Sequence, residues 1–280
     1  DMTVINTNIA ASITANSMKS NQRAMETTME RLSTGKRINS ASDDAAGLGI
    51  ETRMTSQIKG LETASRSAND GIALLQTADG AIAAMGDMFQ RMRELAVQAQ
   101  SGTLLTADKT NLNQEFAALA SEIDRIATDT TFNNIAILGA NKGAVKIMVG
   151  ADEADTITFT TKDMQLSVTG TWTTDVSSFK AAGGTFDVET AAVIGHIDVA
   201  ITAVAAERAS IGATVNRLEY AVENLNQSVV NAKSARSQIT DADYASETTE
   251  LARTQIISQA STAMLSQANQ QAQSVLALLK

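Results

Sequence analysis

A long stretch in the second half of the chain places apolar residues at alternating steps of three and four positions. The stripe extends from Ile194 to Ile239, and Arg208 and Arg236 interrupt it. A step that averages 3.5 residues keeps one side of a helix turned toward a partner helix, which is the pattern of a coiled coil. We therefore predict a helix of roughly 65–70 Å, at about 1.5 Å per residue. The aliphatic stems of both arginines are expected to lie along the stripe.

A second stripe with the same step lies upstream and supplies a partner helix. It extends from Met54 to Phe89 and has weak points at Ser65, Asp79 and Gly86. Two matching stripes predict that the two helices pack along each other over most of their length.

Residues beside these stripes mark the ends of helices. Ser42 or Asp43 can cap the start of the upstream helix, and Gly102 can end it. A third helix is predicted from about Thr106 to Ala127, because its apolar residues recur at helical spacing.

Strand patterns are confined to a short part of the chain. Residues 144–150 alternate apolar and polar side chains, and residues 156–161 do so again after an acidic turn, which predicts a β-hairpin. The predicted fold is mainly α: an elongated antiparallel coiled-coil helical bundle with a small β-hairpin-containing lobe in the middle of the chain.

The composition agrees with long helices and excludes several kinds of function. The chain has no proline and only 3% aromatic residues, which suits uninterrupted helices. A net charge of -9 argues against a nucleic-acid partner, because such proteins need a basic face. The sequence contains no apolar run long enough to insert into a membrane.

No pattern in the sequence predicts catalysis, and we expect neither an enzyme nor a cofactor site. The chain lacks cysteine, and its single histidine, His196, has no cysteine partner for a metal site. The acidic pair of Asp43 and Asp44 stands at a helix start, where adjacent side chains point apart.

Both ends of the chain carry apolar residues at helical spacing, and residues 275–280 (VLALLK) form a nearly bare apolar tip. We expect the two ends to pair as helices whose remaining apolar surface is covered by neighbouring copies of the chain, because ordering them alone costs more entropy than their burial returns. The expected assembly residues of the first end are Ile5, Ile9, Ile13, Met25, Met29 and Leu32. Those of the second end are Leu251, Ile257, Met264, Leu265, Val275, Leu276, Leu278 and Leu279, with Ile257, Met264, Ala268, Val275 and Leu278 sharing one seam.

Several long motifs resemble the bacterial flagellin family, and they follow one another in the family's order. They cover about residues 1–160 and 190–280. The motifs are VINTN (4–8), RLSTGKRINSASDDAAGLGIETRM (31–54), ANDGIALLQTADGAI (68–82), QRMRELAVQA (90–99), FNNIAIL (132–138), ARSQITDADYASETTELARTQII (235–257) and AMLSQANQQAQSVLALLK (263–280).

The resemblance implies an extracellular structural subunit that polymerises with itself into the helical flagellar filament, the propeller for swimming. It implies export in an unfolded state by the flagellar type III apparatus with an export chaperone, and contacts with the filament cap and hook-associated proteins. It also implies a division of the chain into three parts. They are residues 1–42 with 240–280 as the filament core, 43–140 with 190–239 as the coiled-coil bundle, and 141–189 as a β-rich surface segment.

The resemblance further implies that a host Toll-like receptor recognises one surface of the bundle. The matching residues are Arg91, Leu95 and Glu115. The alternative role for these residues is lateral contact between protofilaments.

Two other readings remain open at this point. A junction protein between the hook and the filament is built on the same kind of helical bundle. A chemoreceptor-like signalling coiled coil is also rich in alanine and poor in proline, but it requires membrane spans and tolerates no β-lobe between its helices.

Overall fold

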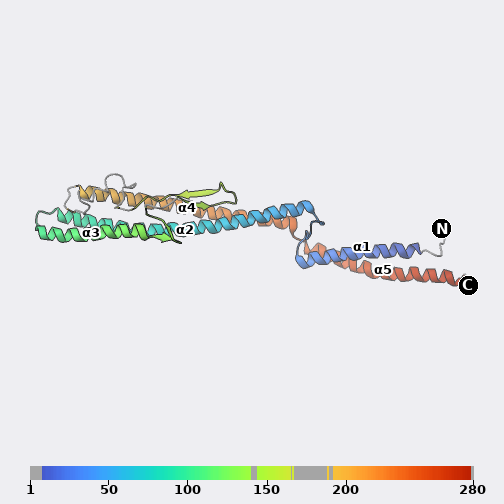
Figure 1. Ribbon diagram of the computed structural model, residues 1–280. Helices are drawn as coiled ribbons and strands as arrows, with labels where there is room; N and C mark the ends of the chain where they lie inside the picture. The colour runs from blue at the N-terminus through green and yellow to red at the C-terminus, as the bar shows by residue number, and fades with distance from the viewer. Residues whose placement is uncertain (1–7, 140–143, 165, 167–187, 189–191, 279–280) are drawn as a thin grey trace. The chain divides into compact units, whose positions relative to one another are not determined.

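The structure is a computed structural model that describes residues 8–139, 144–164, 166, 188 and 192–278, with side chains described as far as residue 270. In this part of the chain, five helices and two small antiparallel hairpins are present (Figure 1). The helices are α1 (Ile9–Thr34), α2 (Ala45–Ala99), α3 (Thr106–Asp129), α4 (Val193–Thr240) and α5 (Tyr244–Leu278). The strands are β1 (Thr131–Phe132), β2 (Ile135–Ala136), β3 (Val145–Met148) and β4 (Thr156–Phe159). The predicted mainly α fold with a small β-hairpin lobe is confirmed.

The chain divides into two compact units. The first contains residues 1–58 and 230–280, and the second contains residues 59–229. Helices α2 and α4 contribute residues to both units.

In the second unit, α2, α3 and α4 lie side by side around one hydrophobic core (Figure 1). The core contains the side chains that the two apolar stripes predict, which confirms the coiled-coil packing of α2 against α4. Fully buried members from the stripes and from α3 are Ala68, Leu75, Ile82, Phe89, Phe116, Ile123, Ile197 and Leu218.

One weak point of each stripe meets the other, because Asp79 on α2 pairs with Arg208 on α4. The other two weak points on α2 face residues of α4 that do not interrupt its stripe, Ser65 facing Asn226 and Gly86 facing Val204, and the partner number falls as the α2 number rises. The helices are therefore antiparallel, and the matched positions define their register. The contacts are Ser65 Oγ donating to Asn226 Oδ1 (3.2 Å), Arg208 Nε donating to Asp79 Oδ1 (2.8 Å), and Gly86, where an added Cβ would lie 3.3 Å from Val204 Cγ1.

The Asp79–Arg208 ion pair stands where the sequence predicts that an arginine stem lies along the stripe. The guanidinium also reaches the second carboxylate oxygen at 3.3 Å. Hydrogen bonding to Asp79 raises the pKa of Arg208. The interruption on one helix is thus paired with the interruption on the other, which favours this register over a shift by one heptad.

A double-mutant cycle tests this pairing. Because both side chains are partly exposed, we expect a coupling free energy of about 0.5–1 kcal/mol between Asp79→Ala and Arg208→Ala. Urea unfolding of the four variants measures it, and high salt is expected to reduce it. A coupling of zero at low salt would contradict a role in register.

The β3–β4 hairpin packs against α2 in the second unit. Its register places Val145 opposite Phe159 and Ile147 opposite Ile157, so the apolar side chains share one face as predicted. Gly71 on α2 permits close approach, because an added Cβ would lie 2.5 Å from Ile147 Cδ1.

The start of α2 is capped differently from the expectation. The side chain of Asp44, rather than Ser42 or Asp43, accepts a hydrogen bond from the Gly47 N–H at 2.8 Å, because the helix begins at the next residue. Asp43 instead closes the preceding turn by accepting the Ser40 N–H at 2.9 Å, and this bond contributes most to lowering the pKa of Asp43.

Candidate functional site

Helices α1 and α5 of the first unit lie side by side (Figure 1). Four side-chain bonds join them, and the α5 partner comes earlier in the chain as the α1 residue comes later. The two ends of the chain therefore pair as antiparallel helices, as predicted. The bonds are Asn8 Nδ2 to the Ala268 carbonyl (3.1 Å), Asn21 Nδ2 to the Thr254 carbonyl (2.7 Å), Arg31 Nη1 to Glu247 Oε1 (3.2 Å) and the Tyr244 hydroxyl to the Leu32 carbonyl (2.7 Å).

Each helix of this pair has a stripe of buried or half-buried residues at alternating steps of three and four. We call these two stripes the inner seam. Both stripes contain small and polar residues as well as aliphatic ones. On α1 the seam contains Ala11, Thr14, Met18, Asn21, Met25, Thr28 and Leu32. On α5 it contains Leu251, Thr254, Ser258, Ser261, Leu265 and Ala268.

The two most buried residues of the inner seam are threonines. Thr28 Oγ1 donates to the Ala24 carbonyl at 3.0 Å, and Thr254 Oγ1 donates to the Glu250 carbonyl at 2.9 Å. Because both hydroxyls are satisfied within their own helices, their burial carries little polar penalty. Their side chains also remove less apolar surface from water than leucines would.

Among the described side chains of the pair, six large aliphatic ones lie outside the inner seam, and we call them the outer residues. Their exposed fractions range from 38% to 67% in this chain. Ile9 and Ile13 share one face of α1, and Ile257 and Met264 share one face of α5, because their spacings return to the same side of a helix. The outer residues are Ile9, Ile13, Met29, Ile256, Ile257 and Met264.

The structure distributes the predicted assembly residues between these two sets. Met25, Leu32, Leu251 and Leu265 are in the inner seam. The outer residues include Ile9, Ile13, Met29, Ile257 and Met264.

Ile257, Met264 and Ala268 were expected to share one seam. Ala268 lies in the inner seam and is half-buried, whereas Ile257 and Met264 are exposed. Other predicted positions fall where no side chain is described: Val275, Leu276 and Leu278 near the end of α5, and Ile5 and Leu279 outside the described residues.

The residues that sequence analysis missed are mostly small and hydroxylated. Thr28, Thr254, Ser258 and Ser261 line the inner seam, and Ile256 is an outer residue. Their heptad spacing was the signal, but it is visible only when threonine and serine are counted as possible contact residues.

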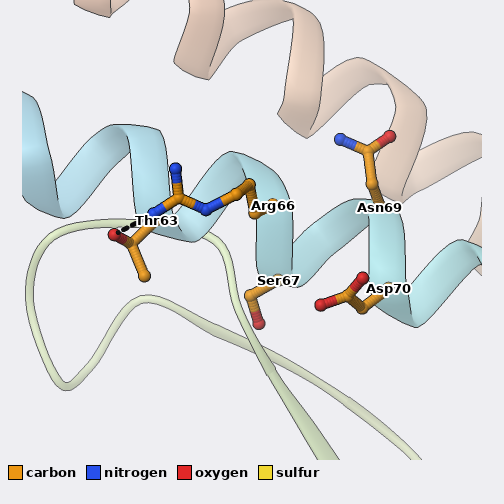
Figure 2. A pocket seen from close by; sticks show the side chains of 5 residues that line it. All are labelled: Thr63, Arg66, Ser67, Asn69 and Asp70. Carbon is orange, nitrogen blue, oxygen red and sulfur yellow. Dashed lines mark hydrogen bonds between the residues drawn. The ribbon is translucent and has the colours of Figure 1, made fainter.

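One surface hollow of the described residues, of about 340 Å³, is lined by polar residues of α2, and Arg66 Nη2 donates to Thr63 Oγ1 beside it at 3.0 Å (Figure 2). Within the described residues, acidic and histidine side chains form no group suited to a metal ion. Nor does any described helix have the length and apolar character to cross a bilayer.

Comparison with known proteins decides the family. Residues 5–142 match the bacterial flagellin N-terminal helical region, and residues 194–279 match the bacterial flagellin C-terminal helical region. The chain belongs to the bacterial flagellin family. These two regions contain all five described helices of this flagellin except Val193, the first residue of α4, and they leave the middle of the chain between them.

Relatives of full length agree with this assignment. A flagellin of Halalkalibacterium halodurans is 42% identical over 99% of this chain and 100% of its own length. A flagellin of Bacillus subtilis is 41% identical over 99% of both chains. Among solved structures, a putative flagellar hook-associated protein from Vibrio parahaemolyticus has a TM-score of 0.57 at 12% identity, covering 71% of this chain and 100% of that chain. That likeness shows a shared fold alone.

This flagellin is therefore a subunit of the flagellar filament, a structural protein whose place is outside the cell. The junction-protein and chemoreceptor readings are not favoured, because identity to flagellins extends over the whole length. The charged surface that sequence analysis singled out lies in the second unit.

On that surface of this flagellin, Arg91 and Glu115 join α2 to α3 through an ion pair of 2.9 Å. Arg91 also pairs with Glu94 on its own helix at 2.9 Å. Leu95, in contrast, is fully buried in the hydrophobic core. The expectation that Leu95 lies on the contact surface is corrected, because its side chain points into the core of the bundle and away from solvent.

Proposed function

We propose that the outer residues of the α1–α5 pair contact neighbouring copies of the chain in the filament. One observation carries the proposal: the inner seam mixes small and polar side chains with aliphatic ones, while six large aliphatic side chains among those described lie on the outside of the pair. A helix pair that folded for its own stability would bury the isoleucines between the helices, where each is worth about 2 kcal/mol.

The exposed aliphatic side chains favour contact between copies of the chain. Ile9 with Ile13 and Ile257 with Met264 form two exposed aliphatic pairs, one on each helix, and exposed apolar surface that neighbouring side chains share marks a site of association. In a homopolymer, the outer residues of one subunit are covered by other subunits, so the same set contributes on every copy.

We extend the proposal to the organisation of the chain. Residues 1–42 and 240–280 form the core of the filament, residues 43–140 and 190–239 form the bundle around it, and residues 141–189 lie at its surface. The hairpin in the last of these segments supports the proposal, because Lys146 and Thr158 on its outer face are exposed.

The remaining partners follow from the family. We propose export in an unfolded state by the flagellar type III apparatus, assisted by a chaperone, and addition to the filament beneath a cap, with hook-associated proteins at its base. The lack of proline supports export, since no slow X-Pro isomerisation delays refolding after passage.

Recognition by a host Toll-like receptor is proposed for Arg91 and Glu115, with Leu95 acting only by supporting α2 from the core. The exposed ion pair supports this, because an arginine held in place loses less side-chain entropy on contact. Purified monomer is expected to activate receptor-bearing cells, and silence at a saturating dose would refute the proposal.

Removal of the last helix tests the assembly function. A chain that lacks residues 246–280 is expected to keep the folded second unit and to lose polymerisation completely, because α1 then has no partner and half of the outer residues are missing. Seeded polymerisation followed by electron microscopy measures the loss, and circular dichroism checks the fold. Normal filaments from the shortened chain would refute the role of the terminal helices.

A further inference from the structure

Two methionines differ from the others in exposure. Among the methionines whose side chains the structure describes, only Met29 and Met264 are more than half exposed, at 55% and 62%. Met85, Met92 and Met164 are buried in the core of the second unit. The two exposed thioethers both belong to the outer residues of the helix pair.

The chemistry of a thioether distinguishes these positions from the isoleucines around them. A peroxide transfers one oxygen atom to the methionine sulfur: the O–O bond breaks, an S=O bond forms, sulfur loses two electrons, and hydrogen peroxide leaves as water. The product is a polar sulfoxide in place of a flexible apolar side chain. Isoleucine and leucine cannot undergo this reaction.

We propose that Met29 and Met264 are peroxide-sensitive modification sites whose oxidation to methionine sulfoxide blocks assembly. The inference rests on the proposed function, since it requires that these two residues are covered by neighbouring copies. A sulfoxide oxygen buried in an aliphatic contact accepts no hydrogen bond there, and this unsatisfied acceptor opposes association.

Position strengthens the case for Met264. It lies on the same face of α5 as Ile257, seven residues earlier, so a polar group at this point replaces one of the two large exposed aliphatic side chains of that face. Met29 directly follows Thr28 of the inner seam on α1. A sulfoxide there lies beside the helix contact as well as on the outside.

The consequence is that peroxide affects assembly only while the subunits are free, and not once they are in a filament. The subunit is open to oxidation while it is free, and the filament protects the same sulfurs by covering them. Reduction of the sulfoxide restores the apolar side chain, so the block is reversible.

Footprinting with hydrogen peroxide tests whether the Met29 and Met264 sulfurs are accessible in free subunits and covered in filaments. Free subunits and preformed filaments receive the same dose, and mass spectrometry of peptides measures the oxidised fraction at each methionine. We expect Met29 and Met264 to oxidise in free subunits and to be at least tenfold slower in filaments, with Met85 and Met92 slow in both. Equal oxidation in the two states would refute the placement of these residues in contacts, and with it this part of the proposed function.

Polymerisation of the treated subunits tests the block itself. We expect oxidised subunits to show an increase of about tenfold or more in the critical concentration, equal to about 1.4 kcal/mol for each tenfold. Treatment with methionine sulfoxide reductases is expected to reverse the increase. If filaments protect Met29 and Met264 but fully oxidised subunits polymerise as untreated ones do, the inference fails while the proposed function stands.

Substitution separates these two positions from the other methionines. In the variant Met29→Leu, Met264→Leu, the ratio of critical concentrations with and without peroxide is expected to be close to one. The matched control Met88→Leu, Met148→Leu changes two half-buried methionines and should keep the full peroxide effect. An equal peroxide effect in both variants would overturn the inference.

Discussion

Replacing Ile257 and Met264 together with asparagine is expected to raise the critical concentration for polymerisation by roughly three orders of magnitude. Both side chains are exposed in the single chain, Met264 by 62% and Ile257 by 38%, so both keep apolar surface for contacts with other subunits. Each aliphatic side chain buried between subunits contributes about 2 kcal/mol, and a loss of about 4 kcal/mol corresponds to roughly a thousandfold weaker association. Seeded growth measured by light scattering over a range of subunit concentrations gives the value.

A matched control separates the loss of apolar surface from the effect of asparagine on the helix. The variant Gln255→Asn, Gln267→Asn changes two exposed residues of α5 with at least as large a cost in helix propensity. We expect its critical concentration to stay within a few-fold of the unaltered chain. Equal behaviour of the two variants would show that the outer face of α5 makes no contact between subunits.

Replacing Leu95 with alanine is expected to lower the free energy of unfolding of the second unit by about 2–5 kcal/mol. Leu95 is fully buried among the core residues of α2. Truncation of such a side chain loses its transfer free energy and leaves a cavity that the helices fill only in part. Urea unfolding followed by circular dichroism measures the change.

The control for this variant is Val97→Ala, two residues further along α2. Its side chain is exposed, so we expect a change below about 0.5 kcal/mol. A similar small change for Leu95→Ala would contradict its burial. The prediction also affects receptor experiments: a weaker response of the Leu95 variant reflects loss of structure, whereas Arg91→Ala tests the contact directly.

The long helices of the second unit were predictable because a 3.5-residue apolar period is compatible with few structures other than a coiled-coil helix. A helix with an apolar stripe from Ile194 to Ile239 must bury that stripe, and the stripe from Met54 to Phe89 is its match in length and step. The hairpin of β3 and β4 was predictable for the same reason, since alternation fixes which side chains share a face.

The pairing of Asp79 with Arg208 could be found only from the structure. Sequence analysis treated Asp79 and Arg208 as separate interruptions, each tolerated on its own helix. Whether they meet depends on the axial position of one helix against the other, and a shift by a heptad leaves the apolar pattern almost unchanged. The observed distance of 2.8 Å shows which register the fold adopts.

For the ends of the chain, the sequence by itself determined that two helices form, that they carry aliphatic residues at helical spacing, and that the chain is a flagellin in its motifs. It could not determine which face each helix turns to the other. Only the tertiary structure decided that threonines and serines line the contact while Ile257 and Met264 stay outside. The physical reason is that a helix has several faces with comparable patterns, and the choice between them depends on how closely two backbones can approach, which small side chains permit and a hydrophobic period does not record.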